Sequence, residues 1–142
     1  MSSRTMLLPL ALATATMFVP GVALACRCGE FTPAGAYRQA DAVVVGRVVG
    51  VEGDFLVKGG GVAILSVGKA WKKRVPRRLR VSSRTTCAVA FKRGESYVIY
   101  LKAAAGRAAF STTRCAGTRP LAEAETVMQW LRRNGAGAEV AE

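Results

Sequence analysis

The stretch from residue 41 to residue 51 reads DAVVVGRVVGV, and it decides the fold. Six of its eleven residues are valine, a β-branched residue that favours strands over helices. The nearly continuous apolar run predicts a buried strand. Gly46 interrupts the run, which predicts a β-bulge or a sharp bend within that strand.

Four further strands are expected on the carboxyl side of this one, at residues 62–71, 79–83, 95–101 and 108–113. The glycines at 59–61 and Gly94 mark turns between them. Five short strands spaced in this way favour a mainly β fold. We predict a closed five-stranded Greek-key barrel of the kind found in oligonucleotide/oligosaccharide-binding (OB) folds.

Two helices are expected to flank this barrel. Residues 34–40 follow Pro33 and predict a short helix on the amino side. After Thr118, apolar residues recur at helical spacing from Leu121 to Leu131, which predicts a helix at the carboxyl end. Pro120 suits its first turn and Gly135 its end.

Residues 1–25 have the pattern of a secretory signal peptide. Arg4 precedes an apolar run from Met6 to Val19, and 23–25 supply the small-x-small cleavage pattern before Cys26. The run is shorter than the roughly 20 residues that a membrane span needs, so cleavage is favoured over anchoring. We therefore expect a secreted or periplasmic domain at 26–134, a flexible tail at 135–142 and no transmembrane span after cleavage.

The state of Cys26 is a separate question, because a lipoprotein site would also place a cysteine first and acylate it. Such sites usually have a branched aliphatic residue three before the cysteine and a small residue two before it. Here Ala23 and Leu24 stand in the reverse order. Plain cleavage, which leaves a free amine on Cys26, is the expectation.

Composition excludes several classes of function. The chain has 142 residues and no histidine, so Ser-His and Cys-His catalytic pairs and histidine metal ligands are excluded. Lys and Arg number 21 against nine Asp and Glu, and 51% of the residues are hydrophobic. This fraction excludes a disordered basic tail. We expect a folded binding module without a cofactor, and not an enzyme.

Four cysteines follow the cleavage site: Cys26, Cys28, Cys87 and Cys115. An even number in a small exported domain predicts disulfides. Four-cysteine zinc sites usually have two close pairs, and only one pair is close here, so zinc is the weaker interpretation. Cys26 and Cys28 are too near in the chain to bridge comfortably, and the residues alone do not decide between the two remaining pairings.

The order of these features resembles the netrin-like family, which includes the tissue inhibitors of metalloproteinases. The mature chain begins Cys26-Arg27-Cys28, and a short helix leads into an A-D-x-V-x-x-G-x-V strand that starts at Ala40. A later strand ends in Trp-Lys, here Trp71-Lys72. A central cysteine, Cys87, is followed by an F-x-x-G-x-x-Y turn at Phe91, Gly94 and Tyr97. A Thr-x-x-Cys stretch runs from Thr112 to Cys115.

The resemblance implies a five-stranded barrel with bridges from Cys26 to Cys87 and from Cys28 to Cys115. It also implies a mechanism, in which the free amine and the carbonyl of Cys26 chelate the catalytic zinc of a partner metalloprotease. The residue after that cysteine normally enters the protease's specificity pocket with a small or uncharged side chain. Here it is Arg27, which departs from the family pattern. Burial of its guanidinium in an apolar pocket without a partner is costly, whereas a pocket with an acidic floor can accept it.

A basic segment offers an alternative site. Six of the nine residues at 72–80 are cationic: Lys72, Lys73, Arg74, Arg77, Arg78 and Arg80. Inside a cell this pattern would indicate nucleic acid, but export makes an anionic polysaccharide, the cell envelope or an acidic partner protein the expected ligand. The last of these would make the domain an accessory protein-interaction module. The alternative interpretation is that the segment has no ligand and is a solvated basic loop between strands.

The aromatic residues invite a similar choice. A stacking platform is one interpretation of Trp71, Phe91, Tyr97, Tyr100 and Phe110, but their apolar strands favour core packing. The leading prediction from the whole sequence is a binding domain that contacts its partner through the amino-terminal segment that begins at Cys26.

Overall fold

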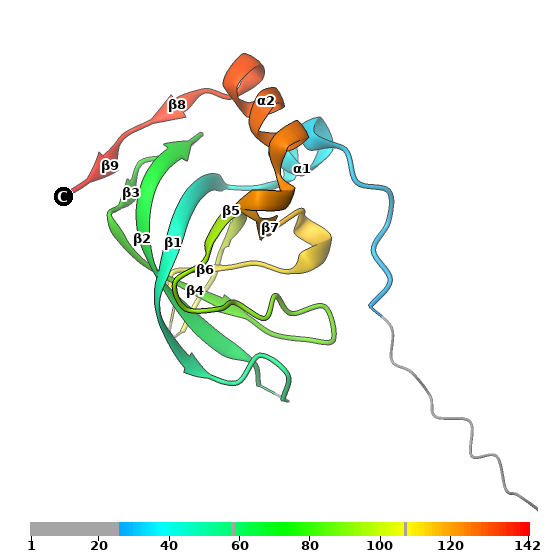
Figure 1. Cartoon of the computed structure of the whole chain (residues 1–142), viewed down its shortest axis with the longest axis vertical. Coiled ribbons are helices and arrows are strands. Elements are labelled where there is room, and N and C mark those ends of the chain that lie inside the picture. The colour runs from blue at the N-terminus through cyan, green and yellow to red at the C-terminus, as the bar shows by residue number, and fades with distance from the viewer. Residues whose placement is uncertain (1–25, 58, 107) are drawn as a thin grey trace, which may run out of the picture.

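The computed structural model describes residues 26–57, 59–106 and 108–142, and the expected signal peptide at 1–25 lies outside the described residues. The barrel consists of five strands: β1 (Ala42–Gly53), β2 (Gly61–Trp71), β4 (Arg78–Ser83), β5 (Ser96–Ala103) and β6 (Phe110–Ser111). Hydrogen bonding runs in the order β1, β2, β4, β6, β5 and returns to β1, with only β4 and β6 parallel. The expected closed Greek-key barrel is confirmed (Figure 1).

Strand β1 closes the barrel because it pairs with two neighbours. Its residues 43–53 pair with β2, and residues 42–47 also pair with β5. The register to β2 shifts between Val45 and Gly46, which confirms the expected bulge, and shifts again between Val48 and Gly50. A Cβ atom at Gly46 would lie 3.3 Å from the carbonyl oxygen of Ser66. Glycine therefore allows the close approach that the bulge requires.

The continuous apolar run of β1 is explained by two cores. Val44 and Val48 point into the barrel, where they pack with residues such as Leu65 and Ile99. Val43, one position along, points to the other face, where it packs with Trp71 and other residues beneath the helices. Alternate residues of a strand face opposite sides, so a strand between two cores is apolar at nearly every position.

All five aromatic residues that were expected to pack in the core are buried, with at most 7% of any of them exposed; they are Trp71, Phe91, Tyr97, Tyr100 and Phe110.

The two helices lie together at one end of the barrel (Figure 1). Helix α1 (Pro33–Gln39) begins after Thr32, whose hydroxyl accepts a hydrogen bond from the N–H of Gly35 at 3.1 Å. Helix α2 (Glu125–Asn134) begins later than Pro120, because β7 (Arg119–Pro120) pairs with β5 and the 3₁₀ turn η2 (Leu121–Glu123) intervenes.

The carboxyl-terminal tail differs from the flexible segment that we expected. Strand β8 (Gly137–Ala138) pairs with the end of β2, and β9 (Val140–Ala141) pairs in parallel with β3 (Val75–Pro76). The last part of β2 and the short β3 offer free backbone edges, which the tail covers. Val140 also packs against the barrel core.

Asp41 ties the start of β1 to the end of β5. Its carboxylate accepts a hydrogen bond from the N–H of Ala103 at 2.8 Å and lies 3.8 Å from the ammonium of Lys102. The backbone hydrogen bond and the neighbouring lysines lower the pKa of Asp41. Among the described residues, no helix is long and apolar enough to cross a membrane.

Candidate functional site

The residues that begin the described chain are attached to the barrel by two disulfides. Cys26 is bonded to Cys87, in the loop between β4 and β5, and Cys28 is bonded to Cys115, in the 3₁₀ turn η1 (Arg114–Ala116). This pairing is the one that the resemblance implied. The two bridges lie side by side, since the Sγ atoms of Cys26 and Cys115 are 3.6 Å apart.

Residues 26–31 form an extended segment, which we call the amino-terminal edge. Cys26 is half-buried, whereas Arg27 and Cys28 are exposed. Within the described part of the chain, no backbone N–H or carbonyl of the amino-terminal edge takes part in a hydrogen bond. The Arg27 guanidinium likewise has no partner there. The amino-terminal edge is therefore a strip of backbone, fixed by disulfides, whose polar groups have no partner among the described residues.

Phe31 holds the other end of the amino-terminal edge. Its ring meets Tyr100 edge to face, with the ring centroids 6.3 Å apart, and the guanidinium carbon of Arg119 lies 4.2 Å from its centroid. Gly117 has a φ of 102°, and a Cβ there would collide with the Phe31 ring. The edge is thus held by covalent bonds at one end and by ring packing at the other.

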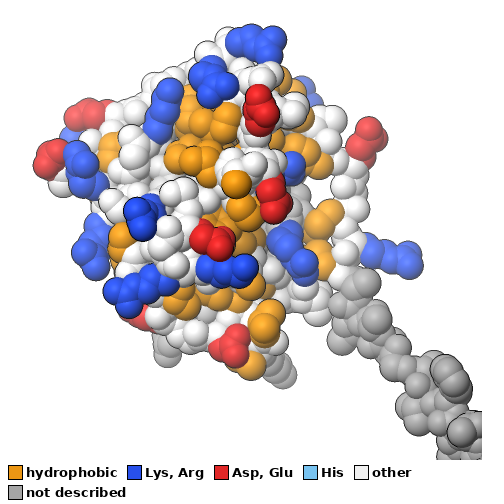
Figure 2. Space-filling view, in the orientation of Figure 1, with side chains coloured by type: hydrophobic (Ala, Val, Ile, Leu, Met, Phe, Trp, Pro, Cys, Tyr) orange, Lys and Arg blue, Asp and Glu red, His pale blue; other side chains and the backbone are white. Residues whose placement is uncertain are grey.

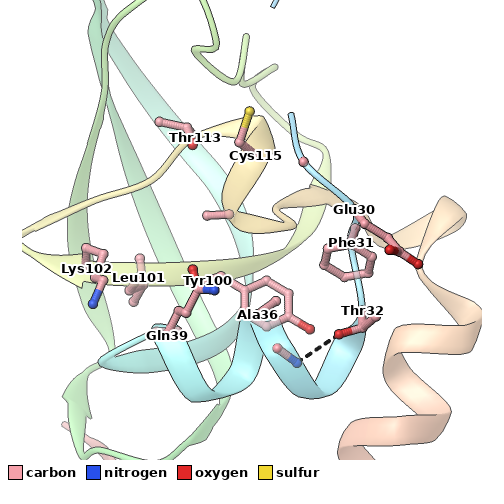
Figure 3. A pocket seen from close by; sticks show the side chains of 14 residues that line it. Glu30, Phe31, Thr32, Ala36, Gln39, Tyr100, Leu101, Lys102, Thr113 and Cys115 are labelled. Carbon is pink, nitrogen blue, oxygen red and sulfur yellow. Dashed lines mark hydrogen bonds between the residues drawn. The ribbon is translucent and has the colours of Figure 1, made fainter. Parts of the chain in front are cut away.

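A cavity of about 390 Å³ lies beside the amino-terminal edge, between it, helix α1 and β5. Figure 3 shows the rings of Phe31 and Tyr100 next to each other, between Cys115 and the first turns of α1. The Tyr100 hydroxyl is buried and has no hydrogen-bond partner among the described residues. Burial raises the pKa of this phenol to about 12, and the opposing effect of Arg119 is smaller.

Two buried threonines hold the backbone of Tyr100. The Tyr100 N–H donates to the hydroxyl of Thr118 at 2.9 Å, and the Thr112 hydroxyl donates to the Tyr100 carbonyl at 2.7 Å. The two hydroxyl oxygens are 2.6 Å apart. Strand β5 pairs with β7 before this point and with β6 after it. The two hydroxyls therefore bind the backbone of β5 between the parts that pair with β7 and with β6. The ring of the same residue, Tyr100, packs against Phe31.

The basic segment at 72–80 is not one open cationic patch. Arg74 lies 3.5 Å from the Glu139 carboxylate, and Arg77 lies 2.7 Å from Glu142. Arg80 forms two hydrogen bonds to the Glu52 carboxylate, at 2.7 and 2.6 Å.

Lys72 is also occupied. Its ammonium donates to the carbonyls of Tyr37, Arg38 and Ala40, where helix α1 ends. Of the other two cations, Lys73 lies 5.9 Å from the ring centroid of Phe110, and the exposed Arg78 has no side-chain partner among the described residues. The segment therefore offers less free charge than its sequence suggests.

The part of the basic segment that forms β3 lies away from the amino-terminal edge, whereas Lys72 reaches helix α1. Figure 1 shows β3 and β9 at one edge of the barrel and residues 26–32 at the other. On the face drawn in Figure 2, Lys and Arg side chains are spread among acidic and apolar ones and form no continuous cluster.

Comparisons with known proteins add no assignment: no family model matches this chain, and no curated protein matches it significantly.

The four cysteines and Arg27 are recognisable from the sequence, whereas the residues that support them were not predicted. Phe31 is the single aromatic residue between Cys28 and helix α1, and that isolation in a polar stretch was the available signal. The contact with Arg119 depends on a strand nearly ninety positions later, and nothing in the sequence indicates it.

Proposed function

We propose that this protein is an exported, disulfide-stabilised netrin-like domain that binds another protein through its amino-terminal edge. The observation that carries this proposal is the combination of rigidity and free polar groups. Residues 26–31 are held by two disulfides and by Phe31, yet their backbone forms no hydrogen bond to the described residues. A rigid edge loses little conformational entropy on binding.

The most specific form of this proposal is inhibition of a zinc metalloprotease. Cleavage before Cys26 would expose an α-amine with a pKa of about 8, so a fraction of it is neutral and able to bind metal near neutral pH. The amine and the Cys26 carbonyl would then be two ligands to the partner's zinc. The carbonyl has no hydrogen-bond partner among the described residues, which leaves it available.

Arg27 would determine which protease is bound. Its exposed guanidinium has no ion pair with the described carboxylates, so nothing within the domain competes for it. A specificity pocket with an acidic floor would pair with this charge, whereas an apolar pocket would have to desolvate it without compensation. The expected partner is a metalloprotease that prefers a basic residue.

The test begins with the mature amino terminus, measured by mass spectrometry. Chelation requires an unmodified Cys26 amine. The protein is then assayed against a panel of zinc metalloproteases, beside a variant with one added alanine before Cys26. This matched control keeps both disulfides and moves only the amine, so we expect it to lose inhibition with an unchanged unfolding midpoint.

Two substitutions test the specificity. Arg27→Thr is expected to shift inhibition toward proteases with apolar pockets, and Arg27→Glu to abolish it for proteases with acidic ones. Equal inhibition by the extended and unextended proteins, or none by any variant, would refute the chelation mechanism. Binding to an anionic polysaccharide is the second candidate, but the ion pairs of Arg74, Arg77 and Arg80 leave it with less support.

A further inference from the structure

The four cysteine sulfurs form a compact cluster. All four Sγ atoms lie within 4.8 Å of one another. Between the two disulfides, the Sγ atom of Cys26 is 3.6 Å from that of Cys115 and 3.8 Å from that of Cys28. Four thiolates around a tetrahedral zinc ion, with Zn–S bonds of about 2.3 Å, are separated by about 3.8 Å. The contacts between the bridges already have this spacing.

We propose that the reduced form of this protein binds one thiophilic metal ion, such as Zn²⁺, through Cys26, Cys28, Cys87 and Cys115. The oxidised form does not bind it, because disulfide sulfurs are not thiolates. The proposal is independent of the proposed protease inhibition, which needs the oxidised form.

The cysteine positions do not depend on the disulfides alone. The N–H of Arg114 donates to the carbonyl of Cys87 at 2.9 Å, which joins the Cys87 loop to the turn that carries Cys115. The N–H of Cys87 donates to the Thr85 hydroxyl at 3.2 Å. These two cysteines therefore remain neighbours after reduction.

The other two cysteines remain tethered near this pair through Phe31. Its packing on Tyr100 and Arg119 fixes the chain three residues after Cys28. The barrel core contains none of the cysteines, so reduction leaves its apolar contacts intact. A metal ion would meet a site in which Cys87 and Cys115 are already neighbours and Cys26 and Cys28 are tethered nearby, which lowers the cost of binding.

Two cations adjoin the cysteines in the chain. Arg27 stands between Cys26 and Cys28 in the chain, and Arg114 precedes Cys115; the one carboxylate of the amino-terminal edge is that of Glu30. Neighbouring cations stabilise thiolates and offset the negative charge of a metal tetrathiolate. Cys28 and Cys115 are exposed, so a reductant can reach their bridge first.

A dithiol supplies the electrons and protons that reduce the two disulfides. Two dithiol molecules each transfer two electrons and two protons to one protein disulfide, giving four thiols and two oxidised dithiols. Binding of Zn²⁺ then releases four protons as four Zn–S bonds form.

The experiment uses Co²⁺ as a spectroscopic probe on protein reduced with a phosphine, which avoids competing thiols. We expect the d–d bands of tetrahedral cobalt and the sulfur-to-cobalt charge-transfer band, saturating at one ion per chain and displaced by Zn²⁺. Zn²⁺ should also raise the thermal unfolding midpoint of the reduced protein and leave that of the oxidised protein unchanged.

The matched control is the double variant Cys26→Ser with Cys87→Ser, which keeps one disulfide and, after reduction, two thiols. We expect it to bind Co²⁺ at least tenfold more weakly and without the four-thiolate spectrum. The proposal is overturned if the reduced wild-type protein unfolds in the presence of metal, if it binds one ion per two chains, or if it matches the double variant.

Discussion

The hydroxyls of Thr112 and Thr118 form a closed ring of hydrogen bonds with the backbone of Tyr100, and this ring can be tested. Each hydroxyl has one proton. Thr112 gives its proton to the Tyr100 carbonyl, so the short contact between the two hydroxyls requires Thr118 to donate to Thr112. Thr118 in turn accepts from the Tyr100 N–H. The perturbation is Thr→Val at each position, which removes the hydroxyl and nearly preserves the shape.

The magnitudes follow from what each substitution leaves unpaired. Thr118→Val leaves the buried Tyr100 N–H without an acceptor, which costs about 1–3 kcal/mol. Thr112→Val leaves the Tyr100 carbonyl without this donor, and an unpaired carbonyl is tolerated better than an unpaired N–H. We expect about 2 kcal/mol for Thr118→Val and about 1 kcal/mol for Thr112→Val.

The double variant distinguishes a ring from two independent bonds. Each single variant breaks two of the three hydrogen bonds, and the bond between the hydroxyls is lost in both. The double variant should therefore cost less than the sum of the single variants, by about 1 kcal/mol, the net worth of one hydrogen bond.

Urea unfolding of the wild type, both single variants and the double variant measures this coupling in a double-mutant cycle. Thr→Ser at each position is the control, because serine keeps the hydroxyl and the three hydrogen bonds, so the two serine substitutions should show no coupling. Costs for Thr112→Val and Thr118→Val that add within about 0.3 kcal/mol would refute the ring, because independent bonds add.

Three other predictions follow from single features. Lys72 has a strained positive φ of 71°, and its ammonium caps α1. Lys72→Ala should lower the free energy of unfolding, measured with denaturant, and Lys72→Gly should lower it by about 1 kcal/mol less, because glycine relieves the strain. The reverse order would contradict backbone strain at this position. The Cys28–Cys115 bridge spans 87 residues, so replacing both cysteines with serine should lower the free energy of unfolding by at most about 4–5 kcal/mol, and an unchanged unfolding midpoint would contradict its role as a constraint. Burial raises the pKa of Tyr100 to about 12 in the folded state, whereas the unfolded state releases this proton at a pH of about 10. The free energy of unfolding should therefore fall as the pH rises between these values, and it should fall less steeply in Tyr100→Phe. Parallel pH profiles of the two proteins would exclude this titration.

The barrel was predictable from the sequence because its central strand is under two constraints at once. Val43 and Val44 pack into different cores, so the stretch must be apolar at nearly every position, and that pattern is visible without a structure. The bulge at Gly46 was visible for a similar reason, since a side chain there would crowd the backbone of β2.

The state of the basic segment was not predictable, because it depends on the tail. Glu139 and Glu142 reach Arg74 and Arg77 only after the chain has passed through helix α2 and returned to β3. The strands of the tail are only two residues long. An element of that length is too short to show the alternation of apolar and polar residues that identifies a strand. Local patterns predict elements, whereas ion pairs between distant segments require the tertiary fold.

Most residues that carry the family resemblance have structural roles in this protein. Asp41 joins β1 to β5, Gly46 allows the bulge, Trp71 fills the core under the helices, and Lys72 caps α1. A pattern made of such residues predicts the barrel, and it carries no information about a ligand.

Under the proposed function, the information about the partner lies in the amino-terminal edge, where Arg27 stands at the position that has a small or uncharged residue in the netrin-like pattern. That side chain packs against none of the described rings and pairs with no described carboxylate. Its substitution should leave the fold unchanged, since exposed positions without contacts contribute little to stability. Any change in binding caused by Arg27→Thr is then a direct measure of recognition, which makes this position the most informative one for establishing the partner.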